Sequence, residues 1–322
     1  MQAIHSCSII GISIELEPAE LQTYGICRPI PSLCHSSKQY PANLFQRGRV
    51  VLFMDTNLLD NKFARMGARL KLADRLARHI RSTAGAVLLD VQTDRRGEFF
   101  QIVTPPGAEA ELEVLDLQPA DRHLLLLIRD GKDKSKFLCG HDERHWFVAA
   151  IPEAASVGTV RQAKEALKPA EVRAAQARKG IKGKARSRRK NAAYVRQGEW
   201  FFLPVSGLVV DAKLILRDEP ISRGSGKPHW ADFCYRTGGE LVYVSPIYYP
   251  NGVSEATYRR LIIKNPKAKG WGWRTFRRNP GVFVRGRIRH PDHKPIVLHG
   301  WHRVLMNTEG QSKALRNVAF LD

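Results

Sequence analysis

Short apolar runs separated by polar turns fill the chain from Glu111 to Ile151, and this pattern limits the fold more than any other feature. Runs of this length, bounded by turn residues, are typical of β-strands. The turns between them, QPAD, DGKD and GHDER, are short enough to join strands that pair antiparallel. The pattern predicts four strands, at Glu111–Leu117, His123–Arg129, Lys136–Cys139 and His145–Ile151.

Upstream of these strands the chain predicts a helix followed by a hairpin. Apolar residues recur at near-helical spacing from Asn57 to Arg81, with a break expected at Gly67. Two apolar runs within 86–104 flank a glycine-containing turn at 94–97, which indicates a β-hairpin.

Downstream of residue 155, helical and strand patterns alternate. Two helices are expected within 156–179, where Ala, Glu, Lys and Arg dominate and Pro169 suits the start of the second. Ser254 can cap a further helix, which Pro266 ends. The remaining apolar runs predict a strand pair at 199–205 and 209–217, a strand at 240–249, and a closing hairpin of 282–290 with 295–307.

These elements predict an α+β protein of two domains, each made mainly of short antiparallel strands, joined by a basic helical connector. The expected parts are a poorly structured N-terminal extension (1–53), a small β-rich α+β domain (54–154), the basic helical connector (155–195) and a basic antiparallel β-rich domain (196–322). Met54 opens a stretch typical of a native start, so the sequence leaves open whether 1–53 belongs to the native product.

Cysteine content and hydropathy bear on the compartment. The chain of 322 residues has five widely spaced cysteines and no C-x-x-C pair, which argues against both a disulfide framework and a zinc ribbon. No apolar run approaches the roughly 18 residues that a membrane span needs. We therefore expect a cytoplasmic protein with no membrane partner.

Positive charge is concentrated in the C-terminal half. The formal net charge is +21, and residues 155–322 hold 33 basic against 12 acidic residues. A one-sided excess of this kind indicates a polyanionic partner, namely nucleic acid, with an acidic protein as the alternative.

Two basic segments are the candidate nucleic-acid contacts. In the first, eight of the thirteen residues in 178–190 are Lys or Arg, which predicts a mobile linker or arm. In the second, 267–289, arginines on one face of a strand can meet phosphates while tryptophans stack on unpaired bases. The candidates are Lys184, Arg186, Arg188, Arg189, Lys190, Trp271, Trp273, Arg274, Arg277, Arg278, Arg285, Arg287 and Arg289. Because aromatics are interleaved and no helix suited to a DNA groove is evident, RNA or single-stranded DNA is favoured.

The closing hairpin also carries four of the 11 histidines. Its turn places His290, Asp292 and His293 close together, which makes them the candidate catalytic group. With His302 from the return strand they could bind a divalent metal ion, whereas the simpler alternative is local hydrogen bonding. His299 and His302 are an odd number of residues apart and should face opposite sides of a strand.

Asp292-His293 followed by Asn307 resembles the ββα-metal (HNH) nuclease pattern, over about twenty residues. The resemblance implies that His293 activates water and Asn307 braces it. The family pattern continues with a helix bearing a further metal-binding His or Asn. After Asn307 this chain has Asn317 but no histidine, and the segment between His293 and Asn307 reads as a strand, not a loop.

The glycine-containing stretch 221–230 has no recognised phosphate-binding motif. Residues 221–230, ISRGSGKPHW, lack P-loop spacing and predict a mobile loop. We expect nucleic-acid binding without a required cofactor, and a metal-dependent nuclease is the alternative.

Overall fold

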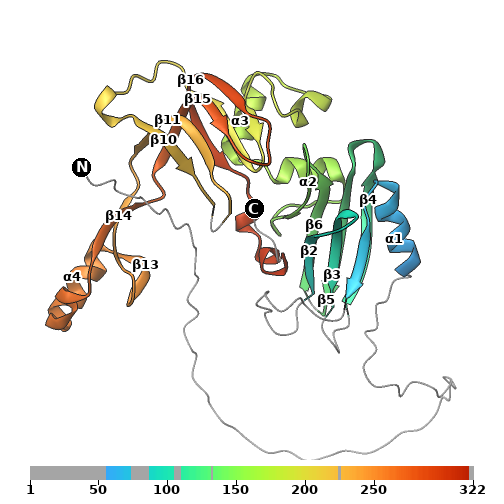
Figure 1. Ribbon diagram of the computed structural model, residues 1–322, viewed down its shortest axis with the longest axis horizontal. Coiled ribbons are helices and arrows are strands. Elements are labelled where there is room, and N and C mark those ends of the chain that lie inside the picture. Colours follow the sequence, from blue (N-terminus) through green and yellow to red (C-terminus); the bar gives the residue numbers. More distant parts are fainter. Residues whose placement is uncertain (1–55, 74–86, 105–109, 132, 224–225, 319–322) are drawn as a thin grey trace, which may run out of the picture.

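The computed structural model describes residues 56–73, 87–104, 110–131, 133–223 and 226–318 (Figure 1). Within these residues, sixteen strands form four sheets and four α-helices pack beside them. All strand pairs in these sheets are antiparallel except that of β1 with β3. A mixed protein of helices and mainly antiparallel strands, as expected, is therefore confirmed, and the predicted extension 1–53 lies outside the described residues.

Two sheets, of strand orders β1-β3-β2 and β4-β5-β6-β7, enclose the first core. Their elements are α1 (Thr56–Arg65), β1 (Leu70–Ala73), β2 (Leu88–Asp94), β3 (Gly97–Val103), β4 (Ala110–Gln118), β5 (His123–Asp130), β6 (Asp133–His141) and β7 (Trp146–Ala150). Phe100 lies at the centre, with its ring 5.1 Å from that of Phe63 on α1 and 5.4 Å from that of Trp146. The four strands predicted between 111 and 151 and the hairpin of 86–104 are confirmed.

Strand β5 is apolar on both faces because each face meets a different layer. Leu124 and Leu126 point into the first core, whereas Leu125 packs against α2 (Val160–Ala166). A capping box between Thr159 and Gln162 begins that helix. Helix α3 (Ala170–Arg178) follows, and it packs against the C-terminal sheet instead. The two predicted helices are thus confirmed, and each contacts a different sheet.

The basic stretch after α3 is folded, which corrects the expectation of a mobile linker. It forms a 3-10 helix, Gly183–Ser187. Arg186 pairs with Glu165 at 2.7 Å, and its carbonyl accepts hydrogen bonds from Lys168 and Gln176. Lys168 is buried, and a buried cation is costly without polar partners. The carbonyl of Arg186 and the carboxylate of Glu165 supply those partners.

The largest sheet has the order β10-β11-β15-β16-β9-β8. Its strands are β8 (Val195–Gln197), β9 (Trp200–Pro204), β10 (Leu216–Ile221), β11 (His229–Thr237), β15 (Gly281–Arg289) and β16 (Ile296–Met306). One face packs around Phe202, Val284 and Ile288. Gly286, at a φ of 86°, forms a bulge where β15 meets β16.

A smaller sheet projects from this large one, as the lower left of Figure 1 shows. We call residues 240–278 the aromatic arm. It contains β12 (Glu240–Ser245), β13 (Tyr249–Ser254), α4 (Glu255–Lys264) and β14 (Arg274–Arg278). The hydroxyl of Ser254 accepts from the Thr257 amide, so the predicted cap and helix are confirmed.

The C-terminal segment returns to the first core. After β16, two 3-10 helices, Glu309–Gln311 and Lys313–Asn317, cross to the N-terminal sheets. Ala314 and Val318 are buried there, and Val318 bridges to Leu89 of β2. The first core is therefore completed by residues from the opposite end of the described chain.

Two secondary-structure predictions are wrong in part. The helix predicted from Asn57 to Arg81 ends at Arg65, close to the expected break at Gly67. Residues 70–73 form β1 instead of helix, because their backbone pairs with β3, and the rest of the predicted helix lies outside the described residues. The segment 209–217 is mostly irregular and does not pair with β9, which lies between β16 and β8. Its apolar residues have no sheet to pack on, and Val209 is 92% exposed. No helix in the described part of the chain is long and apolar enough to cross a membrane.

Candidate metal centre and nucleic-acid interface

A cavity of about 600 Å³ lies between the first core and the large sheet. Strands β2, β6 and β7 contribute one wall, and the turn after β15 contributes the other. The turn residues His290, Asp292 and His293, which the sequence singled out, all line it. A concave site between two layers, with convergent polar groups, has the form expected of a binding or catalytic pocket.

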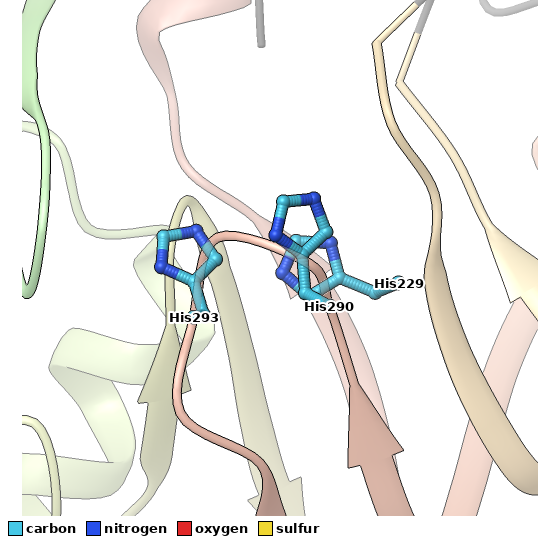
Figure 2. A group of neighbouring side chains, drawn as sticks. All are labelled: His229, His290 and His293. Atoms are coloured by element: carbon cyan, nitrogen blue, oxygen red, sulfur yellow. The ribbon is translucent and has the colours of Figure 1, made fainter.

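Three imidazoles meet at the edge of this cavity, and we call His229, His290 and His293 the histidine cluster (Figure 2). One nitrogen from each ring lies within 4.8 Å of the others. The rings of His229 and His290 are stacked, with centroids 4.2 Å apart, and His293 is 4.7 Å from His290. His229 was missed in the sequence because it comes from the start of β11, about sixty positions from the hairpin, inside a stretch that predicted a mobile loop.

His229 is only 1% exposed, and neither of its ring nitrogens has a hydrogen-bond partner among the described residues. Burial, together with the two neighbouring imidazoles, lowers the pKa of His229 to about 3. Burial likewise lowers the pKa of His293 to about 4. His229 and His293 are therefore neutral imidazoles at neutral pH, which is the form that ligates metals.

Backbone pairing and one glycine position the cluster. The pairs Trp230–Arg289 and Ala231–Ile288 set β11 beside β15, so that His229 faces His290. Gly198, at a φ of 56°, lies against the ring of His293, and a Cβ at that position would come within 2.8 Å of Nε2. The close approach of this turn to the β8–β9 hairpin thus requires glycine.

His290 differs from His229 because both of its nitrogens have polar neighbours. Its Nδ1 accepts from the Asp292 amide at 3.2 Å, and its Nε2 lies 3.3 Å from the carbonyl of Lys227. A ligating histidine commonly donates from its second nitrogen to a backbone carbonyl, as Nε2 can do here, and Nδ1 would have to exchange the Asp292 amide for a metal in order to ligate it.

Asp292 belongs to an ion-pair network beside the cluster. Its carboxylate accepts from Lys227 at 2.8 Å and lies 4.0 Å from His145, which in turn contacts Glu98 at 2.6 Å. Burial alone would raise the pKa of Asp292, but Lys227 together with the nearby His290 and His145 makes the net shift downward. Asp292 therefore faces the cavity as a carboxylate held by a lysine.

The other cavity charges are paired across the layers. Arg189 contacts Asp142 and Glu143, and Glu143 also accepts from the amide of Lys294 at 2.6 Å. Arg223 pairs with Glu309. The Glu143–Lys294 contact joins the turn between β6 and β7 to the closing hairpin across the cavity.

His302 lies away from the cluster. It is buried in the large sheet opposite Val284, and its Nδ1 lies 3.0 Å from the carbonyl of Gly300. His299 is exposed, so the two histidines of β16 differ in environment as expected. The structure thus brings together His290 and His293 from the predicted ligand set and adds His229.

The ββα-metal resemblance can be compared with the geometry. Asn307 lines the cavity, and its side-chain oxygen accepts from the Glu309 amide at 3.3 Å. The segment between the turn and Asn307 is strand β16, and the residues that follow form 3-10 helices. The α-helix that completes the family pattern has no counterpart among the described residues.

The arginine row of β15, Arg285, Arg287 and Arg289, lies on the face opposite Val284 and Ile288. Arg285 stacks over the rings of Phe233 and Trp301. Arg289 pairs with Asp218 at 2.5 Å, and Arg287 lies 3.9 Å from Asp232. Two of the three guanidiniums in the row are therefore partly neutralised within the protein.

The aromatic arm holds the other predicted contacts. Its rings form a stacked series in which Tyr248 lies 4.2 Å from Trp271, and Tyr249 lies 5.6 Å from Trp273. Tyr248 is 52% exposed, whereas both tryptophans are partly covered. Arg274 and Arg277 are exposed, and Arg278 donates to the carbonyls of Asn251 and Gly252 in β13.

The five residues predicted after α3 divide by exposure. Lys184, Arg188 and Lys190 are exposed, whereas Arg186 and Arg189 make the ion pairs described above.

No family model, curated protein or solved structure matches this chain. Function must therefore be argued from these two regions alone.

Proposed function

We propose that the protein binds nucleic acid, namely RNA or single-stranded DNA, through its C-terminal half. The observation that carries the proposal is the aromatic arm, where a half-exposed tyrosine continues a stack of rings among exposed cations. The arm contains eight basic and two acidic residues. Basic surface attracts phosphates regardless of sequence, and exposed rings stack on unpaired bases.

Tyr248 supplies the open end of the stack. Trp271 covers one face of its ring, and Ser245 holds the Trp271 carbonyl through a hydrogen bond of 2.7 Å. A base that stacks on Tyr248 would extend a series of rings whose positions are already fixed, so little side-chain entropy is lost on binding. In this arrangement the two tryptophans hold the Tyr248 ring in place and do not themselves stack on a base.

Exposed cations lie on three elements of the same arm. Helix α4 presents Arg259, Arg260 and Lys264, the following loop presents Lys267 and Lys269, and β14 presents Arg274 and Arg277. Phosphates of a strand that stacks on Tyr248 would pass among them. The arginine row of β15 would extend this path onto the large sheet.

We further propose that the chain comprises two domains joined by a basic helical connector. Separate apolar clusters on either side of the cavity support this division, and α2 and α3 each contact one of them. The buried free thiols of Cys139 and Cys234 support a reducing, cytoplasmic location.

The test is a binding titration with labelled RNA, single-stranded DNA and duplex DNA of about 20 nucleotides, at several salt concentrations with chelator present. We expect tighter binding to single strands, a steep loss of affinity with salt, and no effect of chelator. The double variant Arg274→Gln/Arg277→Gln should bind more weakly. Its matched control is Arg95→Gln/Arg96→Gln, two exposed arginines in the β2–β3 turn. Absence of binding at low salt would favour the acidic-protein alternative instead.

A metal-dependent nuclease is the second candidate, because the turn residues His290, Asp292 and His293 line a cavity that also contains Lys227 and Arg189. Cations can hold a phosphodiester there while a metal activates water. Cleavage that a divalent ion restores and His293→Ala abolishes would establish this activity. Intact substrate under those conditions leaves binding as the function.

A further inference from the structure

We propose that the histidine cluster, His229, His290 and His293, binds one transition-metal ion of the zinc type, with a further coordination position open to the cavity. This site does not depend on nucleic-acid binding. It also differs from the ligand set expected from the sequence, since it uses His229 in place of Asp292 and His302.

The first argument is the state of His229. A neutral imidazole carries one donor and one acceptor, and this ring is buried with neither satisfied. An unsatisfied buried polar group costs roughly 1–3 kcal/mol, so such rings are rarely left without partners. A metal ion held jointly with His290 and His293 would satisfy one nitrogen directly.

The second argument is convergence from separate elements. His229 begins β11, His290 follows the end of β15, and His293 lies in the turn before β16. Two of the three are therefore brought together by strand pairing, and the third is placed by the close approach of Gly198. The cavity wall beyond them is polar and could admit water or a substrate oxygen.

The donor set selects the class of metal. Three imidazole nitrogens suit zinc and its neighbours in the first transition row, whereas magnesium and calcium prefer oxygen ligands. Three protein ligands with an open fourth position are the arrangement of catalytic rather than structural zinc sites. Asp292 is held by Lys227 and would remain outside the first coordination sphere, where its carboxylate could accept a hydrogen bond from a bound water.

Binding requires a small rearrangement of the rings. Ligand atoms around tetrahedral zinc lie about 3.3 Å apart, given bonds of roughly 2.0–2.1 Å. The nitrogens of the cluster are separated by up to 4.8 Å, and the rings of His229 and His290 are stacked. Turning the rings so that their lone pairs converge would close this gap.

The experiment titrates the full-length, chelator-treated protein with Zn²⁺ by calorimetry, in the absence of nucleic acid. We expect one ion per chain, and at least about a 100-fold loss of affinity in His293→Ala and in His290→Ala, because each removes a ligand. Visible absorption of bound Co²⁺ provides a second readout of nitrogen ligation. Mg²⁺ should not compete.

Two controls are matched to these variants. His299→Ala removes an exposed histidine of the same hairpin, and His302→Gln removes the buried one that the sequence suggested as a ligand. Both should leave affinity unchanged. His229→Gln is interpreted only if its circular dichroism is native, because this residue lies beside Trp200 in the sheet core. Failure of the wild type to bind one Zn²⁺, or equal affinity in His293→Ala, would overturn the proposal whatever the outcome with RNA.

Discussion

The aromatic arm and the histidine cluster are built in opposite ways. The arm is one continuous segment, 240–278, that projects from the large sheet and exposes its cations and Tyr248. The cluster draws on two separate segments and buries His229 almost completely. The arm thus resembles an exposed binding surface, whereas the cluster resembles a buried site in which few positions can change.

This difference determines which experiments separate the two regions. Changes in the arm should reduce affinity for a polyanion and leave the cavity intact. Changes around the cavity should affect metal affinity or acid stability and leave the arm intact.

Removal of the whole arm should have the largest effect. Thr237 and Gly281 are paired neighbours of β11 and β15, so deletion of 240–278 leaves the four residues 238, 239, 279 and 280 as a hairpin loop. Loss of eight cations should lower RNA affinity about 1,000-fold or more at low salt, while zinc binding persists. Calorimetry and fluorescence anisotropy on the same protein measure both quantities. Retention of RNA affinity would locate binding elsewhere.

The second prediction concerns acid. Burial lowers the pKa of His123, in the cavity wall, to about 4. The folded state therefore favours the neutral ring, and its stabilisation is complete above the unfolded value near 6.5 and lost as pH falls toward 4. Between pH 7 and pH 4 the free energy of unfolding should fall in both proteins. The fall should be about 2–3 kcal/mol smaller in His123→Gln than in the wild type, because the variant has no ring to protonate.

Urea unfolding at the two pH values measures this difference, with exposed His299→Gln as the control. An equal loss in His123→Gln and the wild type would contradict the role of the buried ring. The arm contains no histidine, so its binding of RNA should not weaken over the same range while the protein remains folded.

The third prediction tests the open end of the stack. Tyr248→Ala should weaken binding of single strands about tenfold, since stacking on one base contributes about 1–3 kcal/mol. Tyr248→Phe keeps the ring and should bind as the wild type does. Anisotropy titrations compare the two, and a Phe variant as weak as the Ala variant would indicate that the hydroxyl matters instead.

The smallest effect should come from a single cation. Arg277→Gln removes one exposed guanidinium of β14, so affinity should fall only a few-fold. The slope of log affinity against log salt should decrease by about 0.7, the value for one phosphate contact on a single strand. An unchanged slope would place Arg277 outside the contact surface.

Local elements could be predicted from the sequence, whereas the candidate site could be predicted only in part. The β2–β3 and β15–β16 hairpins and helix α4 follow from turn residues and a cap within a few positions of each other. His290 and His293 are neighbours in one turn and were predicted together. His229 joins them only through the register of β11 on β15, which no local pattern contains.

The same limit explains the errors. Residues 70–73 have a helical apolar spacing, but their pairing with β3 determines their conformation. Arg186 and Arg189 belong to a run that composition predicts to be mobile, but carboxylates distant in the sequence fix them. In both segments the conformation depends on residues that are far away in the sequence.

The return of the C-terminal segment to the first core has a consequence for synthesis. Ala314 and Val318 fill that core, and Ser312 donates to the carbonyl of Ile151 just after β7. At about 5–20 residues per second, roughly 8–35 s pass on the ribosome between the completion of β7 and the appearance of Val318. During that interval the sheets made first lack the residues that cover Leu89 and its neighbours. We therefore expect the nascent chain to expose this apolar surface until translation is nearly finished, and exposed apolar surface of this kind promotes aggregation.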